Sequence, residues 1–203
     1  MALRLITAPA VEPISLTEAK AHLRINHTDQ DTLIELYIKA ATAYVDGENG
    51  FLGRALVTQT WELVIDEFPT EGEILLPLPP LQSVTSIEYD DGDGLPQTLA
   101  TSEYTVDTVS EPGWVTFGEG GWPTTFDGIN AVRIRYVAGY SPSSDSPPDL
   151  TANVPASIKA AMLLLIGSMF ANREQTIVGV IASQLPFGVE QLLRPYRIQR
   201  GMA

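Results

Sequence analysis

Residues 15–25 have the sequence SLTEAKAHLRI, which joins a helix start signal to a helical run. Ser15 and Glu18 have the spacing of a capping box, in which each side chain accepts a hydrogen bond from a backbone N–H at the helix start. A second helix is expected to begin near residues 29–31, because acidic residues suit a helix N-terminus, and to end before Gly47. At a period of 3.6 residues, its predicted buried face consists of Leu33, Tyr37, Ala40, Ala41, Tyr44 and Val45.

The C-terminal quarter of the chain also has helical sequence. Pro155 suits the first turn of a helix that continues to about Asn172, and a last helix is expected from Val189 to about Leu193, ended by Pro195. The first of these helices is apolar nearly all round, so either the rest of the chain or a neighbouring subunit must cover it on every side. The residues expected to pack against a neighbouring subunit are Ala160, Ala161, Leu164, Gly167, Ser168 and Ala171.

About a hundred residues of β-type sequence separate these helical segments. Short runs rich in β-branched and aromatic residues alternate with turn signals such as DDGDG at residues 90–94. The expected strands are residues 57–66, 74–76, 83–89, 98–99, 103–108, 114–117 and 132–137. The predicted fold class is α+β, a small bundle of about four helices with an inserted antiparallel β-sandwich-like domain. We expect residues 1–55 and 151–203 to form the discontinuous helical domain, and residues 56–150 to form the inserted β domain.

The charge of the chain follows the same division. Residues 51–150 contain 3 basic and 16 acidic residues, a net charge of −13, whereas residues 151–203 contain 5 basic and 2 acidic residues, a net charge of +3. An overall charge of −13 argues against a protein that binds nucleic acid by neutralising phosphates. The sequence contains no apolar run of 18 residues, so no membrane span is expected. It also contains no cysteine, which fits a reducing cytoplasm and excludes thiolate chemistry.

Residues 194–200, with the sequence RPYRIQR, are basic and carry an arginine at every third position. One interpretation is a frayed, solvated tail. Because the rest of the chain is so acidic, we favour an arm that docks into an acidic groove of a partner, guided by the arginines and anchored by apolar side chains. The residues expected to dock are Arg194, Tyr196, Arg197, Ile198 and Arg200.

Signals for catalysis or metal binding are weak. Residues 90–94 offer clustered carboxylates for Ca²⁺ but lack the EF-hand spacing, so we interpret them as a hairpin turn. His22 and His27, the only histidines, are interpreted as surface residues rather than as metal ligands. No nucleophile elbow, P-loop or dinucleotide fingerprint occurs, so these motifs indicate no enzyme class, and we expect no cofactor and no metal. The tryptophans expected to lie in the β core rather than to bind sugar are Trp61, Trp114 and Trp122.

An ordered series of short motifs runs along the chain. They are LTEAKAHLRI at residues 16–25, Asp31 with Leu33, Ala40-Ala41, GRAL at 53–56 with TQTW at 58–61, LPPLQSV at 78–84 with Ile87 and Tyr89, Tyr104 with Val106, GWP at 121–123, VRIRYVAGY at 132–140, and Pro155 with IKAA at 158–161. In this order, over about residues 13–172, the chain resembles the head-to-tail connector (adaptor) proteins of tailed bacteriophages and related gene-transfer particles.

The resemblance implies a structural virion protein rather than an enzyme. Such adaptors have a helical core with a β insertion and form a ring, usually of twelve copies, beneath the portal of a DNA-filled capsid. The implied partners are the portal protein, further copies of the chain, and a tail, stopper or terminator protein, while double-stranded DNA passes through the channel without tight binding. The implied location is the virion neck, after synthesis in the host cytoplasm. C-terminal segments of such adaptors tend to contact the portal, which implies portal docking for the residues from Arg194 to Arg200.

Two other classes of function remain open at this point. The first is an acidic β-sandwich binding module for carbohydrate or calcium, carried on a helical hairpin. The second is a hydrolase that uses exposed carboxylates. An adaptor should form a ring on its portal, whereas a binding module should titrate with sugar or Ca²⁺ alone, and a hydrolase should lose turnover when one carboxylate is neutralised.

Overall fold

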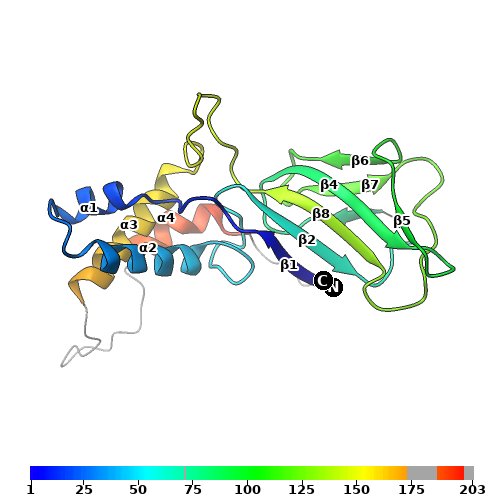
Figure 1. Cartoon of the computed structure of the whole chain (residues 1–203), viewed down its shortest axis with the longest axis horizontal. Coiled ribbons are helices and arrows are strands. Elements are labelled where there is room, and N and C mark those ends of the chain that lie inside the picture. Colours follow the sequence, from blue (N-terminus) through cyan, green and yellow to red (C-terminus); the bar gives the residue numbers. More distant parts are fainter. Residues whose placement is uncertain (71, 173–186, 199–203) are drawn as a thin grey trace. The chain divides into compact units, whose positions relative to one another are not determined.

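The computed structural model describes residues 1–70, 72–172 and 187–198, and its contacts divide the chain into two compact units. Residues 1–10 and 57–141 form a unit of β-strands, which we call the sheet unit. Residues 11–56 and 142–203 form the second unit, whose described elements are helices, and we call it the helical unit. Figure 1 labels the elements of both units. The predicted α+β class is confirmed.

The helical unit begins at the predicted capping box. The Ser15 N–H donates to Glu18 Oε2 at 2.8 Å, and the Glu18 N–H donates to Ser15 Oγ at 3.2 Å, so both side chains satisfy backbone groups at the helix start. The helices that follow are α1 (Leu16–Leu23), α2 (Asp31–Val45), α3 (Ala156–Ala171), α4 (Phe187–Leu193) and the short 3-10 helix η1 (Arg194–Tyr196).

Helix α3 forms the centre of the helical unit, because α1, α2 and α4 all pack against it. Ile158, Met162 and Ile166 of α3 are completely buried. On α2 the buried residues are Ile34, Ile38, Ala41, Thr42 and Val45.

The predicted buried face of α2 is therefore only partly right. Ala41 and Val45 are buried, but Ala40 is exposed, and the other predicted positions are only partly covered: Leu33, Tyr37 and Tyr44. Apolar side chains lie on two sides of α2, so the 3.6-residue period alone does not tell which side faces α3.

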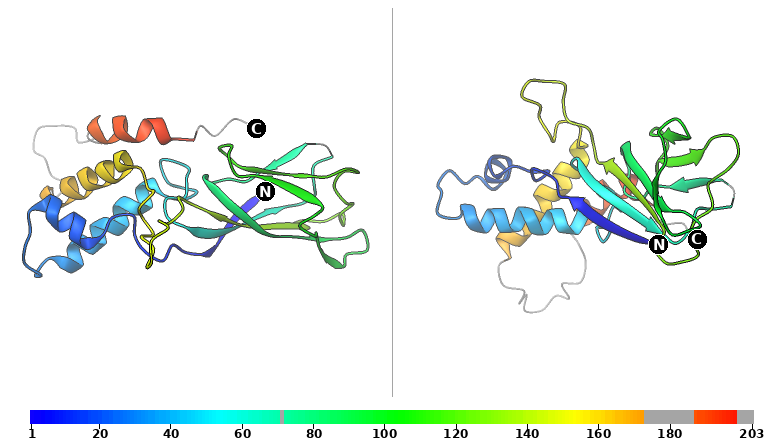
Figure 2. Two further views of the ribbon diagram at one scale, coloured as in Figure 1. Left: turned by 90° about the horizontal axis from the view of Figure 1, so that it is seen from above. Right: turned by 45° about the vertical axis from the view of Figure 1, so that its right-hand side comes forward.

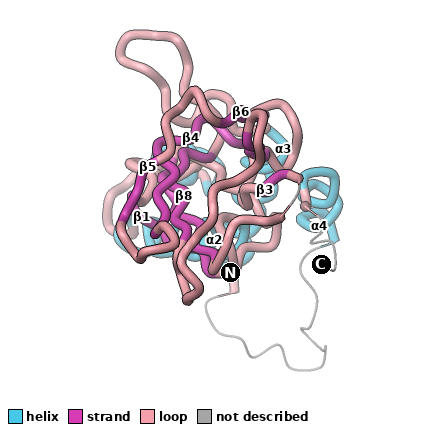
Figure 3. The backbone as a smooth tube through the Cα atoms, turned by 90° about the vertical axis from the view of Figure 1, so that its right-hand side faces the viewer, coloured by secondary structure: helices cyan, strands magenta, loops and turns pink. Residues whose placement is uncertain are grey.

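The sheet unit is an antiparallel sandwich of two sheets. Its five-stranded sheet has the order β1-β2-β8-β4-β5, and its three-stranded sheet has the order β3-β7-β6. Every paired strand runs antiparallel to its neighbour, which allows the short turn connections of the sequence. The strands are β1 (Ala2–Thr7), β2 (Gln59–Ile65), β3 (Glu73–Leu75), β4 (Leu81–Asp90), β5 (Pro96–Thr98), β6 (Tyr104–Asp107), β7 (Trp114–Phe117) and β8 (Val132–Ala138). Figure 3 looks onto these strands and the loops that join them.

Strand β8 lies in the middle of the larger sheet and shows clear two-residue periodicity. Its buried side chains alternate with Arg133 and Arg135, as expected for a strand with one face toward the core. Tyr136 is completely buried, and its hydroxyl donates to the carbonyl of Pro77 at 2.9 Å, so its polar group is satisfied inside the core.

The N-terminal residues depart from the expectation that residues 1–55 are helical. Residues 2–7 form β1, an edge strand that pairs Leu3 with Leu63 and Arg4 with Glu62. The strand's partner lies about sixty residues away in the sequence, so no local pattern reveals the pairing. Residues 142–150, expected in the β domain, instead belong to the helical unit.

Glu62 ties three strands of the larger sheet together. Its side chain is 7 % exposed, and its two carboxylate oxygens accept from Arg4 of β1 at 3.2 Å and from Arg135 of β8 at 2.9 Å. A buried carboxylate is tolerated where charged donors satisfy it, and here the donors come from both neighbouring strands.

We predict that Glu62→Ala lowers the free energy of unfolding by about 2 kcal/mol, because two arginines lose their shared buried acceptor. Urea denaturation followed by circular dichroism measures this loss. Glu67→Ala is the matched control, since Glu67 is exposed, and its effect should stay within about 0.5 kcal/mol. Equal stability of the two variants would show that the Glu62 bridge contributes nothing.

Candidate functional site

The C-terminal segment from Arg194 to Ile198 packs against its own chain. Helix α4 is anchored by Val189 and Leu193, which are completely buried. Beyond η1, the Ile198 N–H donates to the Leu52 carbonyl at 2.9 Å, and Arg54 Nε donates to the Tyr196 carbonyl. The segment is thus part of the helical unit as far as Ile198, and the frayed-tail interpretation is wrong for these residues. Arg200, also expected to dock, lies outside the described residues.

The loop between α2 and β2 receives this segment. Asp46 Oδ1 accepts from the Leu56 N–H at 2.7 Å, and the Phe51 N–H donates to the Tyr44 carbonyl at 2.7 Å, so the loop folds back on the end of α2. Gly50 is required at its position, because an added Cβ would lie 2.3 Å from the Asp46 carbonyl oxygen. The loop therefore has a fixed shape before it meets the C-terminal segment.

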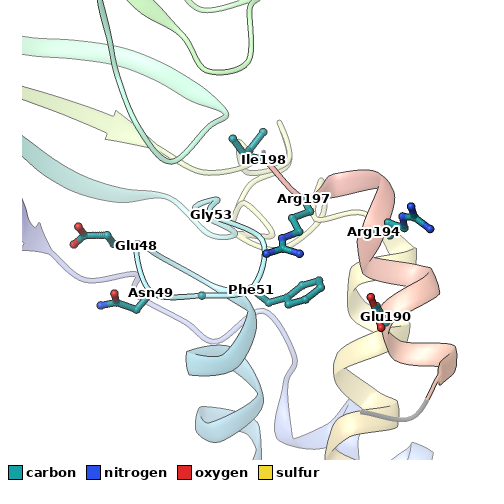
Figure 4. A pocket seen from close by; sticks show the side chains of 9 residues that line it. Glu48, Asn49, Phe51, Gly53, Glu190, Arg194, Arg197 and Ile198 are labelled. Carbon is teal, nitrogen blue, oxygen red and sulfur yellow. The ribbon is translucent and has the colours of Figure 1, made fainter. Parts of the chain in front are cut away.

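A groove of about 890 Å³ lies between this loop and the α4–η1 segment. Figure 4 shows Arg197 and Phe51 at its centre, and the Arg197 guanidinium lies 4.7 Å from the centre of the Phe51 ring. Phe51 in turn stacks on Tyr44, with ring centres 5.8 Å apart. Burial raises the pKa of the Tyr44 hydroxyl, and the nearby charge of Glu190 raises it further. The residues that line the groove are Glu48, Asn49, Gly50, Phe51, Gly53, Glu190, Arg194, Arg197 and Ile198.

The groove contains charges of both signs and an aromatic ring, which is the composition of a protein contact surface. Glu48 and Glu190 balance Arg194 and Arg197. Sequence reasoning found the arginines but missed Phe51 and Arg54, which hold the segment in place. The glycines at positions 47, 50 and 53 indicate a loop in the sequence, but no local pattern indicates that this loop contacts the C-terminal segment.

The residues of α3 expected to pack against a neighbouring subunit do not share one environment. Ala161 is completely buried within the chain, and an added Cβ on Gly167 would lie 3.2 Å from His22 Nε2 of α1. Leu164 is 41 % exposed, and Ala171 is exposed. Ala160 and Ser168 are partly buried. The chain's own helices cover much of α3, and within the described residues Leu164 and Ala171 are the exposed members of the set.

The acidic turn of residues 90–94 is built from internal hydrogen bonds. Asp91 accepts from the N–H groups of Asp93 and Leu95, each at 3.0 Å, and from the Gln97 side chain at 2.8 Å. The bonds from Leu95 and Gln97 lower the pKa of Asp91, and the bond from Arg133 lowers that of Asp90. The turn interpretation accounts for this geometry. Within the described residues, no three acidic or histidine side chains gather as metal ligands.

The two histidines lie apart in different surroundings. Both are exposed, as predicted: His22 lies beside Gly167 of α3, and His27 Nδ1 lies 3.7 Å from Asp29 Oδ2. They form no common site.

The tryptophans are engaged within the sheet unit. Trp61 is 7 % exposed, Trp114 is partly buried, and Trp122 stacks on Phe68 with ring centres 4.7 Å apart. These positions suit a β core rather than a sugar platform. None of the described helices is long and apolar enough to cross a membrane.

The two units differ in charge. The sheet unit contains 14 acidic and 3 basic residues, a net charge of −11, whereas the helical unit has a net charge of −2. All three basic residues of the sheet unit are already paired inside it, because Arg4 and Arg135 bind Glu62, and Arg133 binds Asp90. The remaining carboxylates therefore give the sheet unit a strongly negative surface.

Comparison with known proteins places these features in context. Residues 13–99 match the family described as phage gp6-like head-tail connector protein. No curated protein sequence matches the chain.

Among solved structures, the protein is similar to a chain in the neck of an empty GTA particle computed with C6 symmetry. The two chains are 21 % identical and superpose with a TM-score of 0.76, and the match covers 98 % of this chain and 97 % of the other. A chain in the virion of a native gene transfer agent (GTA) particle gives 21 % identity, a TM-score of 0.75 and the same coverage. A chain in the neck of the native particle computed with C12 symmetry gives 19 % identity and a TM-score of 0.67, again over 98 % and 97 % of the two chains.

At 19–21 % identity the structural similarity establishes the fold. The family match adds a similarity in sequence over residues 13–99. The predicted resemblance to head-tail connector proteins is thereby confirmed, in sequence over residues 13–99 and in fold over nearly the whole chain.

Proposed function

We propose that this chain is a structural virion protein of a phage or phage-like particle, located in the neck between head and tail. The observation that carries the proposal is the combination of a head-tail connector match over residues 13–99 with a fold shared over 98 % of the chain with a component of a GTA neck. The chain is proposed to act by assembly rather than by catalysis, as the head-tail connector match suggests.

The proposed assembly is a ring of the chain beneath the portal. The related neck structures were computed with sixfold and twelvefold symmetry, which supports a cyclic arrangement, and we propose twelve copies. The ring extends the DNA channel and presents a surface to the next tail component, a stopper or terminator protein.

The charge of the sheet unit supports passage of DNA without tight binding. With a net charge of −11 in each copy, twelve copies would place about 130 negative charges in the ring. Such a surface repels phosphate groups, and the three arginines of the sheet unit are already paired with carboxylates.

The C-terminal segment is the proposed portal contact. Arg194 and Arg197 are exposed, while Tyr196 and Ile198 fix the backbone to the α2–β2 loop. Arg200 and the residues after it, which lie outside the described structure, would continue this contact. The alternative of a carbohydrate or calcium module gains no support from the tryptophans, of which Trp61 is buried and Trp122 stacks on Phe68, or from the internally bonded acidic turn.

Electron microscopy of the chain mixed with its portal protein tests the proposed function directly. We expect ring-shaped density added to one end of the portal. Binding of sugar or Ca²⁺ in calorimetry, together with no added density on the portal, would favour the binding-module alternative.

Two truncations separate portal contact from folding. Removing residues 194–203 should abolish attachment to the portal and lower the free energy of unfolding by about 1–3 kcal/mol, because the buried Arg54 loses the Tyr196 carbonyl. Removing only residues 199–203 should weaken attachment while keeping the described contacts of the segment, the bonds of Tyr196 and Ile198. Portal binding by sedimentation and chemical denaturation are the two measurements. Full attachment of the longer truncation would contradict a portal role for this segment.

We also expect no DNA binding by the isolated chain at about 0.1 M salt, measured by fluorescence anisotropy with a short duplex. Replacing Glu67, Glu119 and Asp127, all exposed, with lysine should raise DNA affinity severalfold. The amide variant Glu67→Gln, Glu119→Gln and Asp127→Asn is the matched control, and its DNA affinity should lie between those of the unmodified chain and the lysine variant. Tight binding by the unmodified chain would rule out a repulsive role for the sheet unit.

A further inference from the structure

A second groove, of about 720 Å³, lies in the helical unit on the α1 and α2 side of α3. Ile14 and Ile38, which are 1 % and 3 % exposed, form an apolar floor together with Val11 and Leu16. Residues 148–151, which lead toward α3, complete the wall. The floor is built before any partner binds, because the capping box at Ser15 fixes the start of α1 beside it.

The rim of this groove is acidic. It carries Glu12, Glu18, Glu35 and Asp149, against a single basic residue, Lys39. Glu18 is held by Ser15 and lies 3.7 Å from Lys159, and Asp149 accepts from Thr151.

Glu12 and Glu35 differ from these two, since neither forms an ion pair within the described part of the chain. An apolar floor with unneutralised carboxylates at its edge is complementary to a surface that offers arginine beside apolar or aromatic groups.

The opposite side of the same unit carries such a surface. Figure 2 (left) shows α4 on one side of α3, and α1, α2 and the loop before α3 on the other, and α4 packs against α3. On the α4–η1 edge, Arg194 is exposed and makes no ion pair within residues 1–70, 72–172 and 187–198. Arg197 is exposed over Phe51, and Tyr196 is partly exposed between them. Glu190 of α4 is also exposed on this edge, so the two arginines leave the edge with a net positive charge. The bonds from Arg54 and Ile198 hold this basic edge in shape.

We infer that the acidic groove of one copy binds the basic α4–η1 edge of a second copy. The two surfaces are complementary in charge and lie on opposite sides of one compact unit, so the contact is head-to-tail rather than self-paired. A repeated head-to-tail contact closes into a ring when its rotation allows. The inference rests on the proposed ring and specifies which surfaces join its copies. The portal and a neighbouring copy cannot both cover Arg194 and Arg197, so this inference narrows the proposed portal contact to the residues after Ile198.

Cysteine crosslinking tests the contact with little background, because the chain contains no cysteine. Glu35→Cys and Arg194→Cys are made as separate variants, mixed in equal amounts and oxidised mildly, alone and on the portal. We expect a disulfide between the two variants that forms faster than the disulfide of either variant with itself. Val109→Cys, which is 90 % exposed in the sheet unit, mixed with Arg194→Cys gives the rate of random encounter.

Charge reversal then tests the electrostatic part of the contact. Arg194→Glu should weaken self-association about two- to fivefold, the range for one exposed ion pair, and added salt should weaken the unmodified contact similarly. Mixing Arg194→Glu with Glu35→Arg should restore association between the two variants. Both substitutions alter exposed residues without ion pairs, so the fold should remain intact, as circular dichroism can check.

The outcomes separate this interface from the proposed function. If rings form on the portal but Glu35→Cys and Arg194→Cys crosslink no faster than the Val109→Cys control, the interface is wrong and the ring proposal stands. If Arg194→Cys crosslinks to the portal instead of to a second copy, the portal occupies the basic edge and the inference is overturned. If neither rings nor specific crosslinks form, both proposals fail.

Discussion

The whole arrangement depends on one close approach of backbone in the sheet unit. The chain enters this unit at Val57 and leaves it after Tyr140, and these two residues form a parallel bridge. Gly139 makes the approach possible, because an added Cβ would lie 2.4 Å from the Val57 carbonyl oxygen, and its N–H donates to the Pro80 carbonyl at 2.9 Å. With entry and exit side by side, the insertion leaves the two parts of the helical unit close enough in space for α3 to pack against α1 and α2.

The two units divide the chemical tasks of the chain. The sheet unit is rich in acidic residues, and its three arginines form ion pairs within it, so its surface is strongly negative. The helical unit is nearly neutral but distributes its charge unevenly, with an acidic groove rim on the α1 and α2 side and exposed arginines on the α4 side. This combination suits a protein that contacts other proteins through one unit and repels polyanions with the other.

The C-terminal segment shows how a tail can belong to the fold and still serve as a surface. Its backbone is bound through the carbonyl of Tyr196 and the N–H of Ile198, while Arg194 and Arg197 keep exposed side chains. Ordering the backbone in advance reduces the entropy that a partner must offset on binding. A basic edge that is already in place therefore suits an assembly contact better than a freely moving arm.

The sequence by itself determined the order of helices and strands, the capping box at Ser15 and the charge of each segment, because these follow from local spacing and side-chain chemistry. Even the alternation of β8 could be predicted. The sequence could not reveal β1, since an edge strand is defined by a partner about sixty residues away, or the buried side of α2, since apolar residues occupy both sides. Only tertiary structure brought Arg54 to Tyr196 and placed acidic and basic surfaces on opposite sides of α3, because long-range packing decides which side chains are covered and which remain exposed.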